Sequence, residues 1–229
     1  MQSIVKTVYR SSGSLNIRPH FHDCHQIIFI VKGTVDFCVN GKMLRAVAGD
    51  IAIFSRYENH SVLGCSDEYE RFVLHIDPFV VNRKSPVYSL LTDRPVDFCN
   101  IINVSAHKTE ITDTFNRILS EHNDGSKLAD EMEQLLIEQL LITVYRCTTI
   151  NFDNSYDDVV ARIKRQFENE YHKPLTLAML AKQQNLSISS LSHRFRAATG
   201  VSVMEYLQSC RMANAKQMLA ETECSIGQI

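Results

Sequence analysis

The first hundred residues alternate between short apolar runs and turn signals, which is typical of closely connected β-strands. Residues 26–31 (QIIFIV) form a continuous apolar run, as in a strand buried on both faces, whereas residues 34–39 (TVDFCV) alternate. Asn40-Gly41 is a dipeptide favoured in two-residue hairpin turns. Further strand patterns lie at 42–47, 51–54 and 70–76. Many short strands with close turns predict a small barrel or sandwich.

The hydrophobic period changes after residue 105. Residues 105–122 and 127–148 carry apolar side chains at helical spacing, so both segments are predicted to be helices. A polar stretch without periodicity follows and is expected to be a linker over 149–156. These patterns predict an α+β chain, in which a barrel and two helices form one domain over 1–148 and helices alone form a second over 157–229.

A short helix is predicted at residues 188–198, and its two faces differ in chemistry. Ile188, Leu191 and Phe195 recur at i, i+3 and i+7 and form an apolar face. The opposite stripe carries hydrogen-bonding and positively charged side chains, namely Ser189, Ser192, His193 and Arg196. One face can anchor in a core while the other enters a DNA major groove. The alternative is an ordinary helical hairpin packed into a core.

Capping and turn residues bracket this helix in the order that a helix-turn-helix requires. Ser187 is a suitable N-cap, because its hydroxyl can accept a hydrogen bond from a free backbone N–H of the first turn. Gly200 can adopt the positive φ that ends the helix. Ser202 and Glu205 have the spacing of a capping box for a long helix that follows.

The segment LSISSLSHRFRAATGVSVMEYLQSCRMANAKQMLAET resembles the AraC/XylS family of bacterial transcription regulators. The shared pattern is Leu191, Arg194-Phe195, Gly200, Tyr206-Leu207, Arg211, Ala215 and Leu219. In that family the DNA-binding domain holds two helix-turn-helix units joined by a long helix. The resemblance implies that Ser189, Ser192 and His193 face the bases, and that Arg194 and Arg196 lie near phosphates.

The second unit of that family would begin where this sequence stops. Ser225 would cap its first helix, and the sequence ends at Ile229. The DNA-binding domain is therefore expected to be incomplete within these 229 residues. Because each phosphate contact contributes to affinity through counterion release, we expect residues 1–229 to bind DNA weakly.

Charge and cysteine content narrow the possible classes of function. The net charge of −2 argues against a general polyanion binder, although residues 157–229 hold nine Lys or Arg against seven Asp or Glu. Seven scattered cysteines without a CxxC pair, and an N-terminus without a signal peptide, indicate a reducing, cytoplasmic compartment. Apolar runs are too short to span a bilayer, so we expect no membrane contact.

Histidines gather in the sequence around the first apolar strand pattern. His20, His22 and Gln26 are followed by a glycine, and His60 lies eleven residues after Gly49. This arrangement resembles the two sequence signatures of the cupin barrel. The same barrel is the usual N-terminal half of AraC-like regulators, so the two resemblances support each other.

Three interpretations of these side chains remain open. In the first, they line a pocket for a small effector at the barrel mouth, together with a neighbouring arginine: Arg18, His20, His22, Gln26 and His60. In the second, the histidines and Gln26 hold a divalent metal, although Gln26 stands where cupin enzymes use an acid. In the third, they are structural. We expect the effector pocket, with no metal and no cofactor.

The helix predicted at 127–148 is too apolar for a lone solvated helix. Leu135, Leu136 and Leu140 are among its apolar side chains. In AraC-like proteins a helix in this place often mediates dimerisation, so a homodimer through these leucines is one expectation. The other is that the helix packs on its own barrel and on the helix before it.

The resemblance implies a ligand-responsive DNA-binding regulator whose partners are DNA and a small molecule. A rival hypothesis is a metal-dependent cupin enzyme, and a third is a regulator that acts through protein contacts alone. The sequence contains no Ser-His-Asp order, phosphate-binding loop or dinucleotide fingerprint. We therefore assign no catalytic residues.

Overall fold

The computed structural model describes residues 5–77, 85–92, 94, 98–148, 158–221, 225 and 227. The chain forms two compact units, Met1–Ser155 and Tyr156–Ile229. The expected linker at 149–156 lies outside the described residues. So do most of the residues expected to begin a second helix-turn-helix unit, apart from Ser225 and Gly227.

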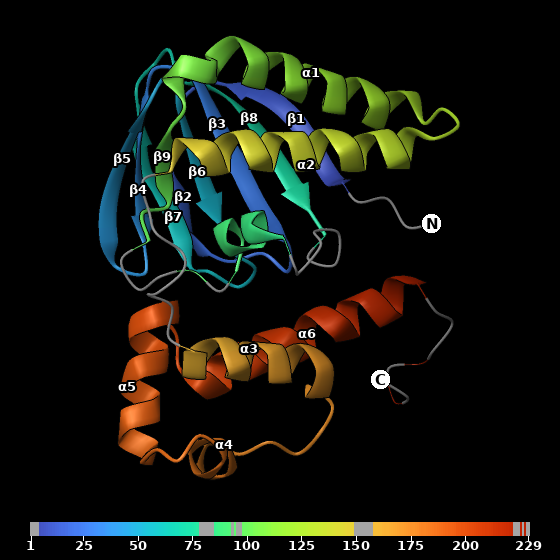
Figure 1. Ribbon diagram of the computed structural model, residues 1–229. Coiled ribbons are helices and arrows are strands. Elements are labelled where there is room, and N and C mark those ends of the chain that lie inside the picture. The colour runs from blue at the N-terminus through green and yellow to red at the C-terminus, as the bar shows by residue number, and fades with distance from the viewer. Residues whose placement is uncertain are drawn as a thin grey trace. The chain divides into compact units, whose positions relative to one another are not determined.

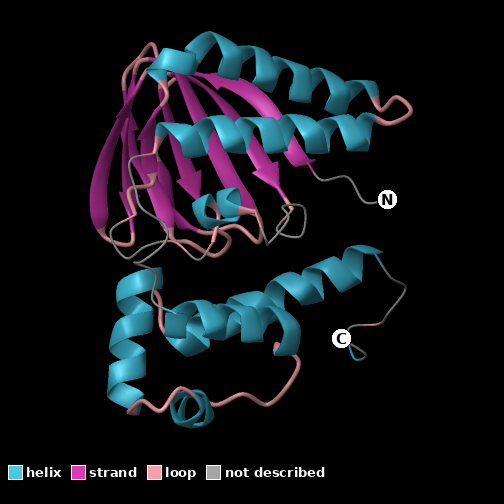
Figure 2. Cartoon of the chain, viewed as in Figure 1, coloured by secondary structure: helices cyan, strands magenta, loops and turns pink. Residues whose placement is uncertain are grey.

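The first unit contains two antiparallel β-sheets that enclose a core (Figures 1 and 2). One sheet has the strand order β1-β8-β3-β6-β9 and the other β2-β7-β4-β5. The strands are β1 (Val5–Ser12), β2 (Ile17–His20), β3 (His25–Lys32), β4 (Thr34–Val39), β5 (Lys42–Val47), β6 (Asp50–Phe54), β7 (His60–Cys65), β8 (Glu70–Ile76) and β9 (Ile101–Asn103). The sheet-rich unit expected from the sequence is confirmed, and so is the hairpin at Asn40-Gly41, where both residues have positive φ.

Strand β3 lies at the centre of its sheet and is buried on both faces. Ile28 and Ile30 point into the core between the two sheets. Ile27 and Phe29 alternate with them and pack on the opposite side of the sheet. This position explains why residues 26–31 read as an unbroken apolar run rather than as an alternating one.

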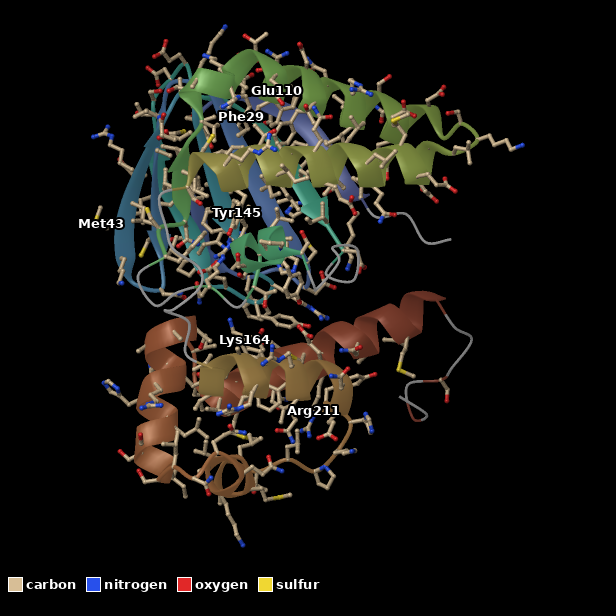
Figure 3. The ribbon with its side chains drawn as sticks, in the orientation of Figure 1. Phe29, Met43, Glu110, Tyr145, Lys164 and Arg211 are labelled. Carbon is tan, nitrogen blue, oxygen red and sulfur yellow. The ribbon has the colours of Figure 1, made fainter. Side chains whose placement is uncertain are left out.

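Two helices cover the outer face of the five-stranded sheet, as Figures 1 and 2 show. They are α1 (Lys108–Asp124) and α2 (Ala129–Cys147). Phe29 stacks on Phe115 of α1, with ring centroids 5.9 Å apart, in the layer between sheet and helices (Figure 3). Two short 3₁₀ helices complete the unit, at Pro86–Leu90 and Ser105–His107. Both helices predicted from the sequence are present.

The second unit is entirely helical in its described part. Its helices are α3 (Asp158–Glu170), α4 (Leu177–Gln183), α5 (Ile188–Thr199) and α6 (Val203–Glu221). Three aromatic rings form its centre: Phe167 and Phe195 lie 6.4 Å apart, and Tyr206 lies 5.5 Å from Phe195. Because these rings come from α3, α5 and α6, one small core holds three of the four helices together.

Local capping fixes the ends of these helices as the sequence predicts. The Ser187 hydroxyl accepts a hydrogen bond from the Ser190 N–H, and Gly200 ends α5 with φ 77°. Ser202 and Glu205 form the reciprocal capping box at the start of α6. Arg211 of α6 donates hydrogen bonds of 2.8 Å to the Tyr171 and Lys173 carbonyls, which ties α6 to the loop after α3 (Figure 3).

Candidate DNA interface and histidine cluster

Helix α5 has one buried face and one open face. Leu191 and Phe195 are fully buried, whereas Ser189 and His193 are exposed and Ser192 is half-buried. The polar stripe expected to meet DNA therefore lies open to solvent. Arg194 and Arg196, which were expected near phosphates, are exposed on the same helix.

The exposure of Ile188 differs from what the sequence predicts for the apolar face of α5. This residue was expected in the core but is 50% exposed. It is the first residue of α5, directly after the N-cap. The buried face runs instead through Leu191, Phe195 and Thr199.

The stripe on α5 carries donors that are free to bind another molecule. Within the described part of the chain, the side chains of Ser189, Ser192, His193, Arg194 and Arg196 form no hydrogen bond or ion pair. One acidic group lies close by. Hydrogen bonds from Ser202 and, to a smaller extent, the charge of Arg196 hold the pKa of Glu205 below its usual value. The net charge of the stripe is therefore positive, but the nearby Glu205 reduces it.

The second candidate site is a cluster of imidazoles at one end of the barrel. His20, His22 and His60 come from β2, the loop after it and β7. The ring centroids of His20 lie 4.8 Å from those of His22 and 4.4 Å from those of His60. Phe54 stacks flat on His60 at 4.2 Å and closes the cluster from the core side.

Backbone carbonyls fix the tautomers of two of these rings. The His60 Nδ1 lies 2.9 Å from the Glu58 carbonyl, and the His20 Nδ1 lies 2.9 Å from the Arg18 carbonyl. Since a carbonyl can only accept, each Nδ1 carries the proton and each Nε2 presents a lone pair. The Nε2 atoms of His22 and His60 are buried and have no hydrogen-bond partner.

Burial favours the uncharged form of His22 and His60. Burial, with a smaller effect of the neighbouring imidazoles, lowers the pKa of His60 to about 3. Burial and the nearby His20 lower the pKa of His22. Neutral imidazoles are the form that binds metals and that accepts hydrogen bonds from hydroxyl groups.

Sequence reasoning missed a fourth histidine of this cluster. His75 on β8 lies 4.8 Å from His22 and 2.9 Å from the Gln26 amide nitrogen. Burial, followed by the effect of His22, lowers the pKa of His75 to about 4. The signal was present in the strand pattern ERFVLHI, because His75 has the same parity as the inward-facing Val73.

The other predicted effector residues differ in position. Gln26 joins the cluster through His75, and its Oε1 is buried without a partner. The Arg18 side chain is exposed, and only its carbonyl contacts the cluster. The structure thus brings His20, His22, Gln26 and His60 together and leaves the Arg18 guanidinium at the surface.

Three of these histidines have the geometry to share one metal ion. His20, His22 and His60 each offer a ring nitrogen, and these atoms lie within 4.8 Å of one another. The carbonyl contacts to two Nδ1 atoms are the kind of support that metal-binding histidines usually have. The donor set therefore fits a transition metal as well as a polar effector group.

The leucines expected at a dimer interface fall into two groups. Leu136 and Leu140 are 2% and 1% exposed and pack in the core of their own unit. Leu135 is 61% exposed. It belongs to an apolar stripe at helical spacing on and just before α2, formed by Leu128, Met132, Leu135 and Ile142.

Comparisons with known protein families match both units. The family model described as AraC-like ligand binding domain matches residues 10–142, and a helix-turn-helix domain matches residues 180–229. The transcriptional activator RhaR of Salmonella schwarzengrund is 21% identical over 216 residues, which cover 92% of this chain and 76% of RhaR.

Solved structures resemble the whole chain. An apo variant of ToxT from Vibrio cholerae has a TM-score of 0.58 at 14% identity, covering 97% of this chain and 84% of ToxT. Wild-type ToxT bound to an unsaturated fatty acid has a TM-score of 0.54 at 15% identity, covering 100% and 86%. At this identity the likeness concerns the fold. Among the described residues, helices are too short or too polar to cross a membrane.

Proposed function

Because this chain belongs to the family of AraC-like regulators, we propose that it is a ligand-responsive transcription regulator that binds DNA through α5 and an effector through its barrel. The observation that carries the proposal is the open polar stripe of α5 above a fully buried apolar face. Its relative RhaR is named an activator, which favours activation over repression. Such a protein acts on DNA in the cytoplasm.

On this proposal α5 lies in the major groove. Ser189, Ser192 and His193 face base edges, while Arg194 and Arg196 bind phosphates. Single serine hydroxyls can pair with several bases, so this helix discriminates sequence less sharply than one with a bidentate arginine or asparagine on the bases. Phosphate contacts therefore supply a large share of its affinity.

Salt dependence of DNA binding tests this arrangement. Fluorescence anisotropy with a labelled duplex, over a series of low salt concentrations, measures the slope of log affinity against log salt. Replacing Arg194 or Arg196 by alanine should reduce that slope by about 1 each, because one phosphate contact is lost. Arg45→Ala, at an exposed arginine of the barrel unit, is the matched control and should leave it unchanged. An unchanged slope in both α5 variants would contradict the proposal.

The histidine cluster is the proposed effector site. The Nε2 of His60 and the Oε1 of Gln26 are acceptors in a buried setting, and the Nε2 of His22 is likewise buried without a partner. They suit the hydroxyl or amide donors of a small polar molecule, which would remove the cost of leaving them unpaired. One similar structure, that of ToxT, is bound to an unsaturated fatty acid, so a protein of this fold can bind a small molecule.

A metal at the same cluster is the second candidate. It is favoured by the convergence of three ring nitrogens from His20, His22 and His60. Elemental analysis of purified, untagged protein separates the two. A stoichiometric transition metal that is lost in a His22→Gln, His60→Gln double variant would replace the effector interpretation, whereas a metal-free protein leaves the nitrogens for an organic ligand.

A homodimer completes the proposal. Leu136 and Leu140 are enclosed within their own unit, so the direct contacts are assigned to the exposed stripe of Leu128, Met132, Leu135 and Ile142. Two copies held rigidly together would raise the effective concentration of one weak DNA reader beside the other.

A further inference from the structure

A buried arginine lies inside the barrel, well away from the histidine cluster. Arg71 is on β8, where Val73 faces the core between the sheets, as does Tyr69 just before the strand, while Phe72 and Leu74 face the helices. Arg71 shares the parity of Tyr69 and Val73, so its side chain points inward, and it is only 6% exposed. His75 lies four positions farther along the same strand, a distance of about 13 Å.

This arginine has no counter-charge. Its Nη1 is buried without a hydrogen-bond partner, and the described residues provide no ion pair to its guanidinium. Its guanidinium carbon lies 5.0 Å from the centre of the Tyr69 ring, which is a cation–π contact. The neighbouring Glu70 lies on the other face of the sheet, where Arg10 and Lys32 bind it at 2.7 and 3.5 Å.

An unpaired buried charge is costly, and arginine cannot relieve the cost by losing its proton. Structures retain such a group where a partner of opposite charge arrives from outside. The cation–π contact with Tyr69 compensates only partly for the missing counter-charge. An anion lying against Arg71 would supply the missing counter-charge.

Hydroxyl-bearing residues of the neighbouring strand lie beside Arg71. Ser11 of β1 is directly opposite Arg71 in the register, and Tyr9 is opposite Val73 on the same face. β1 is the edge strand of its sheet, and Tyr9 is 42% exposed, so this seam of the barrel is open to solvent. Hydroxyl groups around a guanidinium can all donate to one oxyanion.

We propose that Arg71, with Ser11 and Tyr69 beside it, forms a second ligand site of the barrel, which binds the carboxylate or phosphate group of a small organic anion. The planar guanidinium would pair with two of the anion's oxygens. This site goes beyond the proposed function, because it does not depend on whether the histidine cluster holds an effector, a metal or nothing.

Thermal unfolding of the full chain in the presence of defined anions tests the site. Sodium hexanoate and sodium phosphate are compared with sodium chloride at equal ionic strength. At ten times its dissociation constant, an anion that binds only the native state should raise the unfolding midpoint by about 3 °C. The anion that raises the midpoint more, hexanoate or phosphate, shows whether the site prefers a carboxylate or a phosphate group. Equal midpoints in all three salts would overturn the proposal.

Substitutions separate this binding from a structural role. Arg71→Met should abolish the response and leave the midpoint in chloride unchanged or higher, because it removes an unpaired buried charge while keeping the volume. Arg71→Lys should keep a weaker response. Arg45→Met and His60→Gln, outside the site, should respond as the original chain does. If Arg71→Met keeps the full rise of the unfolding midpoint with the anion, or has a lower midpoint in chloride, then Arg71 does not form an anion site.

Discussion

The buried histidines make the barrel unit sensitive to acid, and His60 is the place to test this. We consider His60→Gln, which keeps a polar side chain of moderate size but cannot take up a proton in this range. His60 is 3% exposed, stacks on Phe54 and donates to the Glu58 carbonyl. Its Nε2 has no partner, so protonation would place a charge where no described group can receive it.

The magnitude follows from the two pKa values of His60. Burial lowers its pKa from 6.5 to about 3 in the native protein, whereas the unfolded chain keeps the higher value. Below pH 6.5 the unfolded chain therefore binds a proton that the native chain does not, and stability falls until native His60 titrates near pH 3. At pH 5 the loss is about 2 kcal/mol from this residue alone. His75 and His22, with pKa values lowered in the same direction, add to it.

Urea unfolding at pH 7.5 and pH 5.0, followed by circular dichroism, measures the effect. A chelator is present throughout, because a bound metal would compete with protons for the same nitrogens. Between the two pH values the original chain should lose about 2 kcal/mol more than His60→Gln. His193→Gln, at an exposed histidine of the second unit, should behave as the original chain does. If His60→Gln keeps the full pH dependence, the reasoning from burial is refuted.

Two further predictions concern packing. Phe195→Ala should destabilise the helical unit by about 3–5 kcal/mol, because it leaves a cavity beside Phe167 and Tyr206. Hydrogen exchange of α3, α5 and α6 should become faster together, while exchange of the barrel strands stays unchanged. Unchanged exchange rates in all three helices would contradict the shared core. Leu135→Glu should convert a dimer to a monomer, as measured by light scattering, without changing the unfolding midpoint, because Leu135 is exposed. The matched change Leu136→Glu should unfold the barrel unit instead, because Leu136 is buried. If the mass of the Leu135→Glu protein is unchanged, the dimer interface lies elsewhere.

Much of the fold could be predicted from the sequence because its local signals agree with each other. Residues 34–39 and 70–76 are strands with the predicted bounds, and the caps at Ser187 and Ser202 act as expected. Individual strands β1, β2, β7 and β9 were not distinguished. Their side chains alternate irregularly, and β1 is an edge strand with an open face, so neither apolar runs nor clean alternation marks them.

The candidate sites were only partly predictable, since they depend on which residues the fold brings together. His20, His22 and His60 could be grouped through a motif, whereas His75 and Arg71 carry no motif. Their positions in the barrel become clear only once β8 is placed beside β3 and its inward-facing side chains are known. Likewise, Leu136 and Leu135 are adjacent and equally apolar, and only the packed structure shows which of them is buried.

Site-specific photo-crosslinking shows whether the polar stripe of α5 lies against DNA. A benzophenone amino acid replaces Ser189 on the stripe or, as a control, Met43, which is 72% exposed on the barrel unit (Figure 3). The full chain is irradiated with duplex DNA at low salt. Crosslinked DNA is expected from position 189, and none above background from position 43. Equal yields from both positions would show that α5 does not present this stripe to DNA.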